Sequence, residues 1–211
     1  MEVVNQQLSD YAAAHTSPES SILKKINRDT HANVLKPRML SGHLQGRLLA
    51  MISHMIKPSS ILEIGTYTGY SAICLAEGLK PGGKLITIDK NEELETRLRT
   101  SFKDAGMEQS IELLIGDAMK IIPTLDISFD LVFIDADKQN NANYFDLVIG
   151  KVPAGGYILA DNVLWSGKVI NPSPDKDTRP ILDFNDKVHK DPRVENVLLP
   201  VRDGLMLMRK L

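Results

Sequence analysis

Five short apolar runs, which begin 20 to 26 residues apart, constrain the fold of this chain more than any other feature. They cover residues 61–64, 85–88, 111–115, 131–134 and 157–160, and amphipathic stretches of helical length separate them. The spacing suits repeated strand–helix units, and continuously apolar runs are typical of parallel strands that are covered on both faces. Two more strand-like runs, 194–201 and 205–209, flank Asp203-Gly204, a hairpin turn signal. We therefore predict an α/β fold: a doubly wound, mostly parallel seven-stranded sheet with a C-terminal antiparallel hairpin.

The first 58 residues have helical rather than strand-like patterning. Ser17 and Pro18 offer a helix cap and a first-turn proline, and Pro37 and Pro58 mark chain breaks. Between these breaks, one apolar stripe at helical spacing runs along residues 42–57: Leu44, Leu48, Leu49, Ile52 and Ile56. We predict a single domain over 1–211, with N-terminal helices in 1–58 packed on a catalytic α/β core of 59–211. A further loop and helix are expected near 171–190.

Charge and cysteine content exclude several classes of protein. The chain of 211 residues has 25 basic and 27 acidic side chains, a net charge of −2, which argues against broad binding of nucleic acid. Its one cysteine, Cys74, cannot form an internal disulfide, which favours a reducing compartment. No leader-like start or apolar stretch of about 20 residues is present, so we expect a cytoplasmic protein without a membrane partner.

The turn after the first apolar run has the composition of a nucleoside-binding turn. In an open α/β sheet, ligands bind beyond the carboxyl ends of the strands. Gly65 and Gly69 lie in this turn, but Tyr67 occupies the position at which a dinucleotide-binding fold needs glycine. Asp89 follows the second apolar run, at the position where an acidic residue binds the ribose hydroxyls in nucleotide-binding folds. The pattern indicates a nucleoside without a tightly held diphosphate. An ordinary strand–helix turn and a helix-capping role for Asp89 are the alternatives.

Acidic residues after the fourth and fifth runs predict a metal site. If these strands are neighbours, Asp135 and Asp161 lie about 4.8 Å apart, and Asn162 adds an amide oxygen. Three oxygen ligands suit Mg²⁺, Mn²⁺ or Ca²⁺ and leave about three of six positions open. The alternative is a plain turn at Asp161-Asn162.

The five histidines are scattered and form no zinc motif. The phosphate-loop-like segment 78–85 precedes a strand and lacks the hydroxyl that holds magnesium, so we interpret it as a turn.

Three motifs resemble those of the cation-dependent class I O-methyltransferases, a family that includes the catechol and caffeoyl-coenzyme A O-methyltransferases. They are EIGTYTGYS at 63–71, DADK at 135–138 and DNVLWSG at 161–167. The resemblance extends from about Met39 to the C-terminal hairpin. It implies the Rossmann-like methyltransferase fold and the cofactor S-adenosylmethionine.

The resemblance also implies a role for individual residues. The S-adenosylmethionine site would be lined by Ser41, Glu63, Gly65, Thr66, Ser71, Asp89, Ala118 and Asp137. Asp135, Asp161 and Asn162 would hold a divalent cation (Mg, Mn or Ca), Lys138 would be the general base beside Asp135, and Trp165 would face an aromatic substrate. One departure is Gln45-Gly46, where the family commonly has Glu-Gly, so one charge is lost near the cofactor entrance.

The resulting expectation is a metal-dependent methyl transfer from S-adenosylmethionine to one hydroxyl of a vicinal diphenol, by a protein that forms a homodimer. A nucleotide-binding oxidoreductase on a similar sheet is the alternative, disfavoured by the absence of G-x-G-x-x-G. A non-catalytic cofactor-binding protein on the same fold is a second alternative, because fold alone does not determine function.

Overall fold

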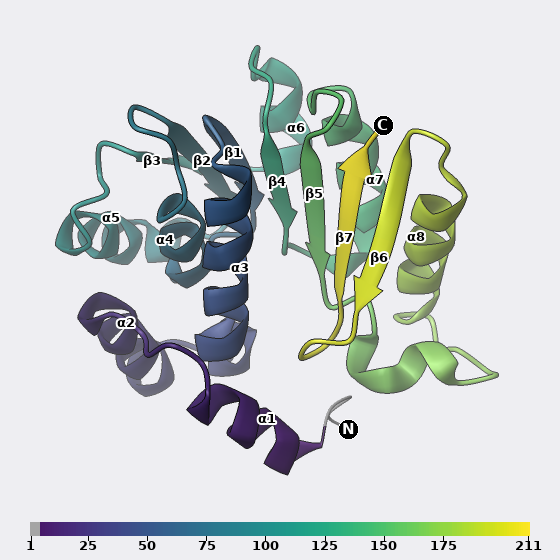
Figure 1. Cartoon of the computed structure of the whole chain (residues 1–211), viewed down its shortest axis with the longest axis horizontal. Coiled ribbons are helices and arrows are strands. Elements are labelled where there is room, and N and C mark those ends of the chain that lie inside the picture. The colour runs from purple at the N-terminus through teal and green to yellow at the C-terminus, as the bar shows by residue number, and fades with distance from the viewer. Residues whose placement is uncertain (1–4) are drawn as a thin grey trace.

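A computed structural model describes residues 5–211 and contains one seven-stranded sheet (Figure 1). The strand order is β3-β2-β1-β4-β5-β7-β6, and β1 to β5 pair in parallel whereas β7 is antiparallel to both of its neighbours. The strands are β1 (Ser60–Ile64), β2 (Lys84–Asp89), β3 (Ile111–Ile115), β4 (Leu131–Ile134), β5 (Tyr157–Asp161), β6 (Val194–Leu199) and β7 (Leu205–Lys210). The predicted doubly wound sheet with a terminal hairpin is confirmed.

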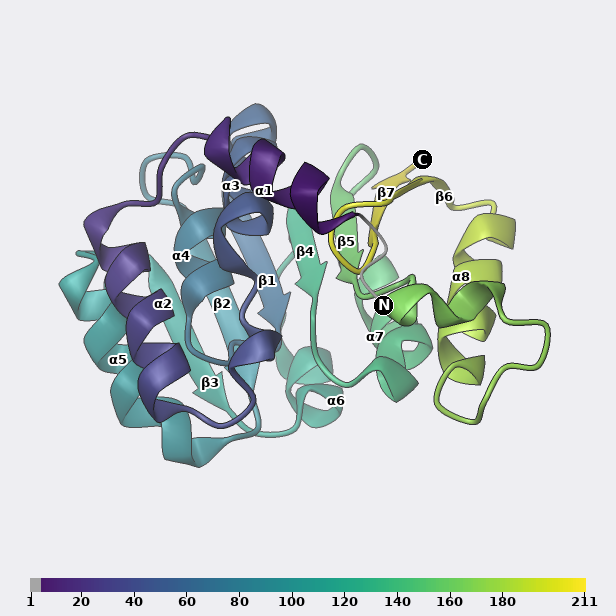
Figure 2. The same ribbon diagram turned by 90° about the horizontal axis from the view of Figure 1, so that it is seen from below.

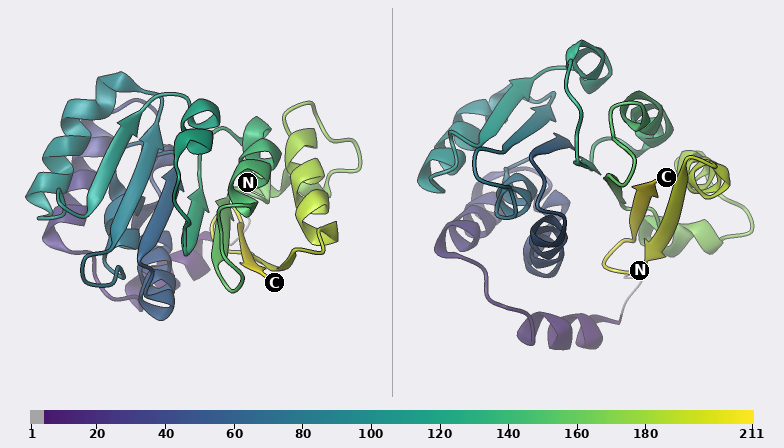
Figure 3. Two further views of the ribbon diagram at one scale, coloured as in Figure 1. Left: turned by 90° about the horizontal axis from the view of Figure 1, so that it is seen from above. Right: turned by 45° about the horizontal axis from the view of Figure 1, so that its top comes forward.

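Helices cover both faces of the sheet (Figures 2 and 3). One apolar layer packs against α2 (Ser21–Asn33), α3 (Gly42–Ile56), α4 (Tyr70–Ala76) and α5 (Glu95–Asp104). The opposite layer packs against α6 (Ala118–Ile121), α7 (Asn141–Ile149) and α8 (Arg179–Lys190). Both faces of the parallel strands are therefore buried, which explains why their apolar runs are continuous rather than alternating.

The remaining elements are short. Helix α1 (Gln6–Ala14) contributes no buried residue to the core. Five 3₁₀ segments connect the larger elements: η1 (Pro37–Met39), η2 (Glu92–Leu94), η3 (Ile122–Thr124), η4 (Lys138–Asn140) and η5 (Trp165–Ile170). Of the helices that the structure describes, none has the length and apolar composition that crossing a bilayer requires. The predicted division of the chain at residue 58 stays a prediction, although α2 and α3 share the core of the sheet.

Two predicted boundaries are wrong for local reasons. Helix α2 begins at Ser21, not after Ser17, because the Ser20 hydroxyl caps it by accepting the Leu23 N–H at 3.4 Å. Strand β6 ends at Leu199 rather than at residue 201, since Pro200 has no N–H to continue the ladder. Helix α3 lies where the pattern predicts it, and residues 78–83 of the segment 78–85 form the predicted connection, whereas its last two residues belong to β2.

Candidate active site

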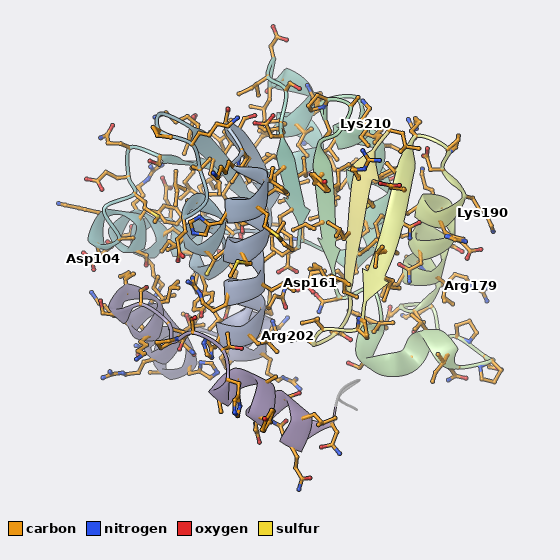
Figure 4. All side chains as sticks on the ribbon, in the orientation of Figure 1. Asp104, Asp161, Arg179, Lys190, Arg202 and Lys210 are labelled. Atoms are coloured by element: carbon orange, nitrogen blue, oxygen red, sulfur yellow. The ribbon has the colours of Figure 1, made fainter. Side chains whose placement is uncertain are left out.

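The carboxyl ends of β1, β4 and β5 meet at one edge of the sheet. Strand β1 lies between β2 and β4, so the chain order reverses there, which is where ligands bind in open α/β sheets. In the β4–β5 pair, Ile134 is the partner of Ala160, and the next residues are Asp135 and Asp161. The predicted neighbourhood of these two strand ends is confirmed, and Figure 4 labels Asp161 at this edge with Arg202 close by.

Asp89 closes the turn that follows β1. Its Oδ2 accepts the backbone N–H groups of Thr66 at 3.0 Å and Tyr67 at 2.7 Å, and its Oδ1 accepts the N–H of Asn91 at 2.8 Å. The carboxylate therefore holds the first turn against the end of β2. The Tyr67 hydroxyl donates to the Leu35 carbonyl at 3.0 Å, so this side chain extends toward the segment after α2.

Glycine at position 65 is required by close packing as well as by conformation. Gly65 has φ +100°, and a Cβ there would lie 2.4 Å from the carbonyl oxygen of Asp135. Both facts exclude a larger residue without displacement of backbone. The turn after β1 and the acidic end of β4 are therefore in direct contact, and this contact unites the nucleoside-type turn and the acidic residues in one site.

Glu63 is a buried carboxyl group beneath this turn. Thr87 donates to its Oε2 at 2.6 Å, and the hydroxyls of Thr87 and Thr66 lie 2.6 Å apart. Its Oε1 is buried and has no hydrogen-bond partner among the described residues. Burial raises the pKa of Glu63 to about 8, although the neighbouring hydroxyls of Ser71 and Thr87 oppose the increase. A buried carboxyl group whose charged form is disfavoured thus lies beneath the turn.

A small cavity brings together half of the predicted cofactor residues. Its lining includes Ser41, Gly65, Thr66, Ser71 and Asp135. Glu63 and Asp89 lie outside this lining, in the chain of contacts just described. Ala118 begins α6 beyond the end of β3.

Asp137 is held by its own neighbours. Its two carboxylate oxygens accept from Asn140 at 2.6 Å and from the Tyr144 hydroxyl at 2.9 Å. Burial and the hydrogen bond to Asp137 raise the pKa of Tyr144 well above its usual range. The carboxylate therefore anchors η4, the segment that carries Lys138, to α7.

Lys138 forms an ion pair with one member of the acidic pair. Lys138 Nζ donates to Asp135 Oδ1 at 2.7 Å, and both side chains are largely buried, with 12% and 15% exposed. Burial raises the pKa of Asp135, Lys138 opposes the increase, and the negative charge of Asp161 adds to it. Asp161 is 3% exposed. Two carboxylates are thus held together in a poorly hydrated place, which favours a bound cation.

Three site residues were missed by the sequence analysis as functional candidates. Gln45 is 1% exposed and donates from Nε2 to Asp161 Oδ2 at 2.8 Å. Arg202, from the β6–β7 turn, donates to Gln45 Oε1 at 2.9 Å and to the Ser41 carbonyl oxygen. Asp203 accepts from the side chain of Asn162 at 3.2 Å. The only signals were the Gln45 departure and the Asp203-Gly204 turn pattern.

Trp165 begins η5 directly after the acidic strand end. Its backbone has φ +47°, and its indole N–H is buried without a partner among the described residues. A left-handed conformation is costly for a bulky side chain and is often found at ligand sites. The predicted contact with substrate stays a prediction.

Comparisons with known proteins show the family to which the chain belongs. The family model described as O-methyltransferase matches residues 13–211. Caffeoyl-CoA O-methyltransferase of Medicago sativa is 34% identical over 181 residues, which cover 79% of this chain and 73% of the relative. Catechol O-methyltransferase domain-containing protein 1 of Mus musculus is 34% identical over 173 residues, 79% of this chain and 66% of that protein.

Solved structures give the same result. A methyltransferase from Podospora anserina with bound S-adenosylhomocysteine has a TM-score of 0.90 at 28% identity, and the match covers 99% of this chain and 97% of that chain. An O-methyltransferase from Bacillus cereus, also with S-adenosylhomocysteine, has a TM-score of 0.89 at 30% identity, with 97% of each chain covered. The fold and the strand-end residues define a class I S-adenosylmethionine-dependent methyltransferase. The chain belongs to the O-methyltransferase family.

Replacing Asp89 is expected to weaken S-adenosylmethionine binding. Asp89→Ala removes the acceptor that holds the Thr66 and Tyr67 amides and the predicted acceptor of the ribose hydroxyls. The expected loss is roughly 1.5–3 kcal/mol, about 10- to 150-fold in Kd, measured by calorimetry. Asp104→Ala, on the exposed end of α5, is the matched control. Wild-type affinity in Asp89→Ala would refute the assignment.

Proposed function

We propose that this protein is a divalent-cation-dependent O-methyltransferase that methylates one hydroxyl of a catechol-like, vicinal diphenol. One observation carries the proposal: Asp135 and Asp161 end neighbouring strands, and Lys138, Asn162 and the Gly65 turn lie at the same edge of the sheet. The relatives named caffeoyl-CoA O-methyltransferase and catechol O-methyltransferase domain-containing protein 1 support this acceptor class. A coenzyme A thioester is not part of the proposal.

The chemistry of the donor set fits a hard divalent cation. Two carboxylates and the amide oxygen of Asn162 are oxygen ligands of the kind that Mg²⁺, Mn²⁺ and Ca²⁺ prefer. Within residues 5–211, no three His, Cys, Asp or Glu side chains are placed to hold a metal, which disfavours a zinc-type site. A cation held by Asp135, Asp161 and Asn162 would orient two adjacent substrate hydroxyls and favour the ionised form of one of them.

The residues of the chain supply positioning and proton transfer. A phenol has a pKa of about 10, so transfer at neutral pH needs a base near the reacting hydroxyl. Lys138 is the candidate base, because its Nζ lies at the edge of the acidic pair and is held there by Asp135. Gly65 lets the cofactor turn approach β4 closely, so that the methyl donor and the acceptor hydroxyl can be held in line.

Substrate selection provides the experiment for this proposal. We expect kcat/KM for a catechol to exceed that for the same molecule without one hydroxyl by at least about 100-fold, since two-point attachment orients the reacting oxygen. Both substrates are assayed with Mg²⁺ and again with excess chelator, which should abolish turnover of the catechol. A ratio near one, or full activity in chelator, would contradict the proposed acceptor or the cation dependence respectively.

A homodimer is also proposed. Large apolar side chains are exposed on the outer faces of α1 and α3: Leu8 at 63%, Tyr11 at 65%, Met51 at 59% and Met55 at 70%. Covering such side chains with a second copy would remove apolar surface from water. Light scattering should give twice the mass of one chain, and Met51→Lys together with Met55→Lys should shift the mass toward the monomer. A wild-type protein that is monomeric at micromolar concentration would overturn the proposed homodimer.

A further inference from the structure

The β6–β7 turn is tied to the segment that follows β5. The carbonyl oxygens of Asp203 and Gly204 accept the N–H groups of Leu164 at 2.9 Å and Val163 at 3.2 Å. The Asp203 carboxylate adds two side-chain contacts: Oδ1 accepts the Ser166 N–H, and Oδ2 accepts the Asn162 side-chain amide at 3.2 Å. A turn 41 residues away in the chain therefore contacts the candidate ligand Asn162 directly.

These contacts determine which end of the Asn162 amide is free. An asparagine side chain offers an oxygen acceptor on one side and an NH₂ donor on the other, and its neighbours decide the orientation. An ionised aspartate is an acceptor only, so Asp203 can face the NH₂ end of Asn162 but not the oxygen end. Oδ1 of Asn162 is thus the end left for a ligand.

We propose that Asp203 is a positioning residue that presents the carbonyl oxygen of Asn162, rather than its NH₂ group, to the cation. The inference rests on the proposed cation dependence and adds a residue outside the ligand set. An NH₂ group cannot ligate a hard cation, so the orientation of this one amide decides whether the site has three protein oxygens or two. Partners that orient a metal ligand commonly change metal affinity by 10- to 100-fold.

Asp203→Asn tests the orientation with an isosteric change. The amide introduced at position 203 has one acceptor oxygen instead of two. If that oxygen still accepts the Ser166 N–H, the NH₂ of residue 203 faces Asn162. This NH₂ favours the orientation of Asn162 in which its oxygen points toward residue 203 and its own NH₂ points toward the cation site. We expect Mn²⁺ affinity to fall 10- to 100-fold, measured by calorimetry or by the electron paramagnetic resonance signal of free Mn²⁺. Asp186→Asn, an exposed aspartate on α8, is the matched control and should bind Mn²⁺ like the wild type.

A double-mutant cycle separates orientation from loop structure. A carboxylate at position 162 has an oxygen on both sides, so Asn162→Asp removes the need for orientation. We expect Asp203→Asn to weaken Mn²⁺ binding 10- to 100-fold in the wild-type background but less than threefold in the Asn162→Asp background. If Asp203 acted only by holding the turn, the weakening would be equal in both backgrounds, and that result would overturn the proposal.

The same measurements distinguish the two proposals. A wild-type protein that binds no Mn²⁺ overturns the cation dependence and this inference together. A wild type that binds Mn²⁺, with equal affinity in Asp203→Asn, overturns this inference alone. Should Asp203→Asn by itself fail to fold, the comparison of Asn162→Asp with the double variant still decides, because Mn²⁺ binding that is tenfold weaker in the double variant contradicts the proposal.

Discussion

Asp161→Ala is expected to lose methyl transfer by at least about 1000-fold, roughly 4 kcal/mol of transition-state stabilisation. Asp161 is a candidate cation ligand at the end of β5, and it also accepts the Gln45 side chain at 2.8 Å and the Asn162 N–H at 2.8 Å. Removal of the carboxylate would leave a bound cation with one charged protein ligand, Asp135. Turnover is measured with saturating Mg²⁺, and excess chelator should reduce the wild type to the same level.

The fold of Asp161→Ala has to be checked, because the residue is 3% exposed. Losing the acceptor leaves the buried Gln45 NH₂ without its partner, a cost of about 1–3 kcal/mol in stability. Asp161→Asn keeps the shape and should lose as much activity with less destabilisation. S-adenosylmethionine affinity should remain within a few-fold of the wild type in both variants. Activity above one tenth of the wild type in Asp161→Asn would contradict a ligand role.

Lys138→Met is expected to lower kcat by about 10²- to 10⁴-fold, the range that general-base catalysis typically contributes. The substitution keeps the length and apolar stem of the side chain and removes the amine that lies 2.7 Å from Asp135. Because an unassisted phenol ionises near a pKa of about 10, the residual rate of Lys138→Met should rise with pH more steeply than that of the wild type. Stopped-assay kinetics between about pH 7 and pH 10 measure this difference.

Lys138→Arg is the matched variant for the proposed base. Arginine can keep the ion pair with Asp135, but it stays protonated and cannot accept the hydroxyl proton. We therefore expect Lys138→Arg to fold and bind S-adenosylmethionine normally while remaining nearly as slow as Lys138→Met. Near-wild-type kcat in Lys138→Arg would show that Lys138 serves only as a positive charge.

Much of the fold could be predicted because its signals are local. The apolar runs are continuous since α-helical layers bury both faces of the strands, and a run of this kind is visible without knowing its partners. Asp89, Asp135 and Asp161 lie at strand ends for the same reason, since polar residues directly follow the buried runs. The convergence of Asp135 and Asp161 needed one assumption, that β4 and β5 are neighbours, which the sheet order confirms.

Contacts between distant parts of the chain required the tertiary structure. Gln45 and Asp161 are 116 residues apart, and Asn162 and Asp203 are 41 apart, so no local pattern relates them. The local pattern at Asp203-Gly204 predicts a turn and nothing more, which is correct locally. Where that turn lies depends on β7, which pairs antiparallel to β5 and so carries residues 202 and 203 back to the carboxyl end of β5.

By itself, the sequence determined the class of fold, the strand ends that carry charged residues, and the glycine that the first turn requires. Those properties depend on the periodicity, size and conformational preference of residues near one another in the chain. The tertiary structure alone decided which atoms of Asp161 and Asn162 are occupied and by what, through Gln45, Arg202 and Asp203. The physical reason is that hydrogen-bond orientation depends on the atoms within about 3 Å, which packing brings together from distant segments.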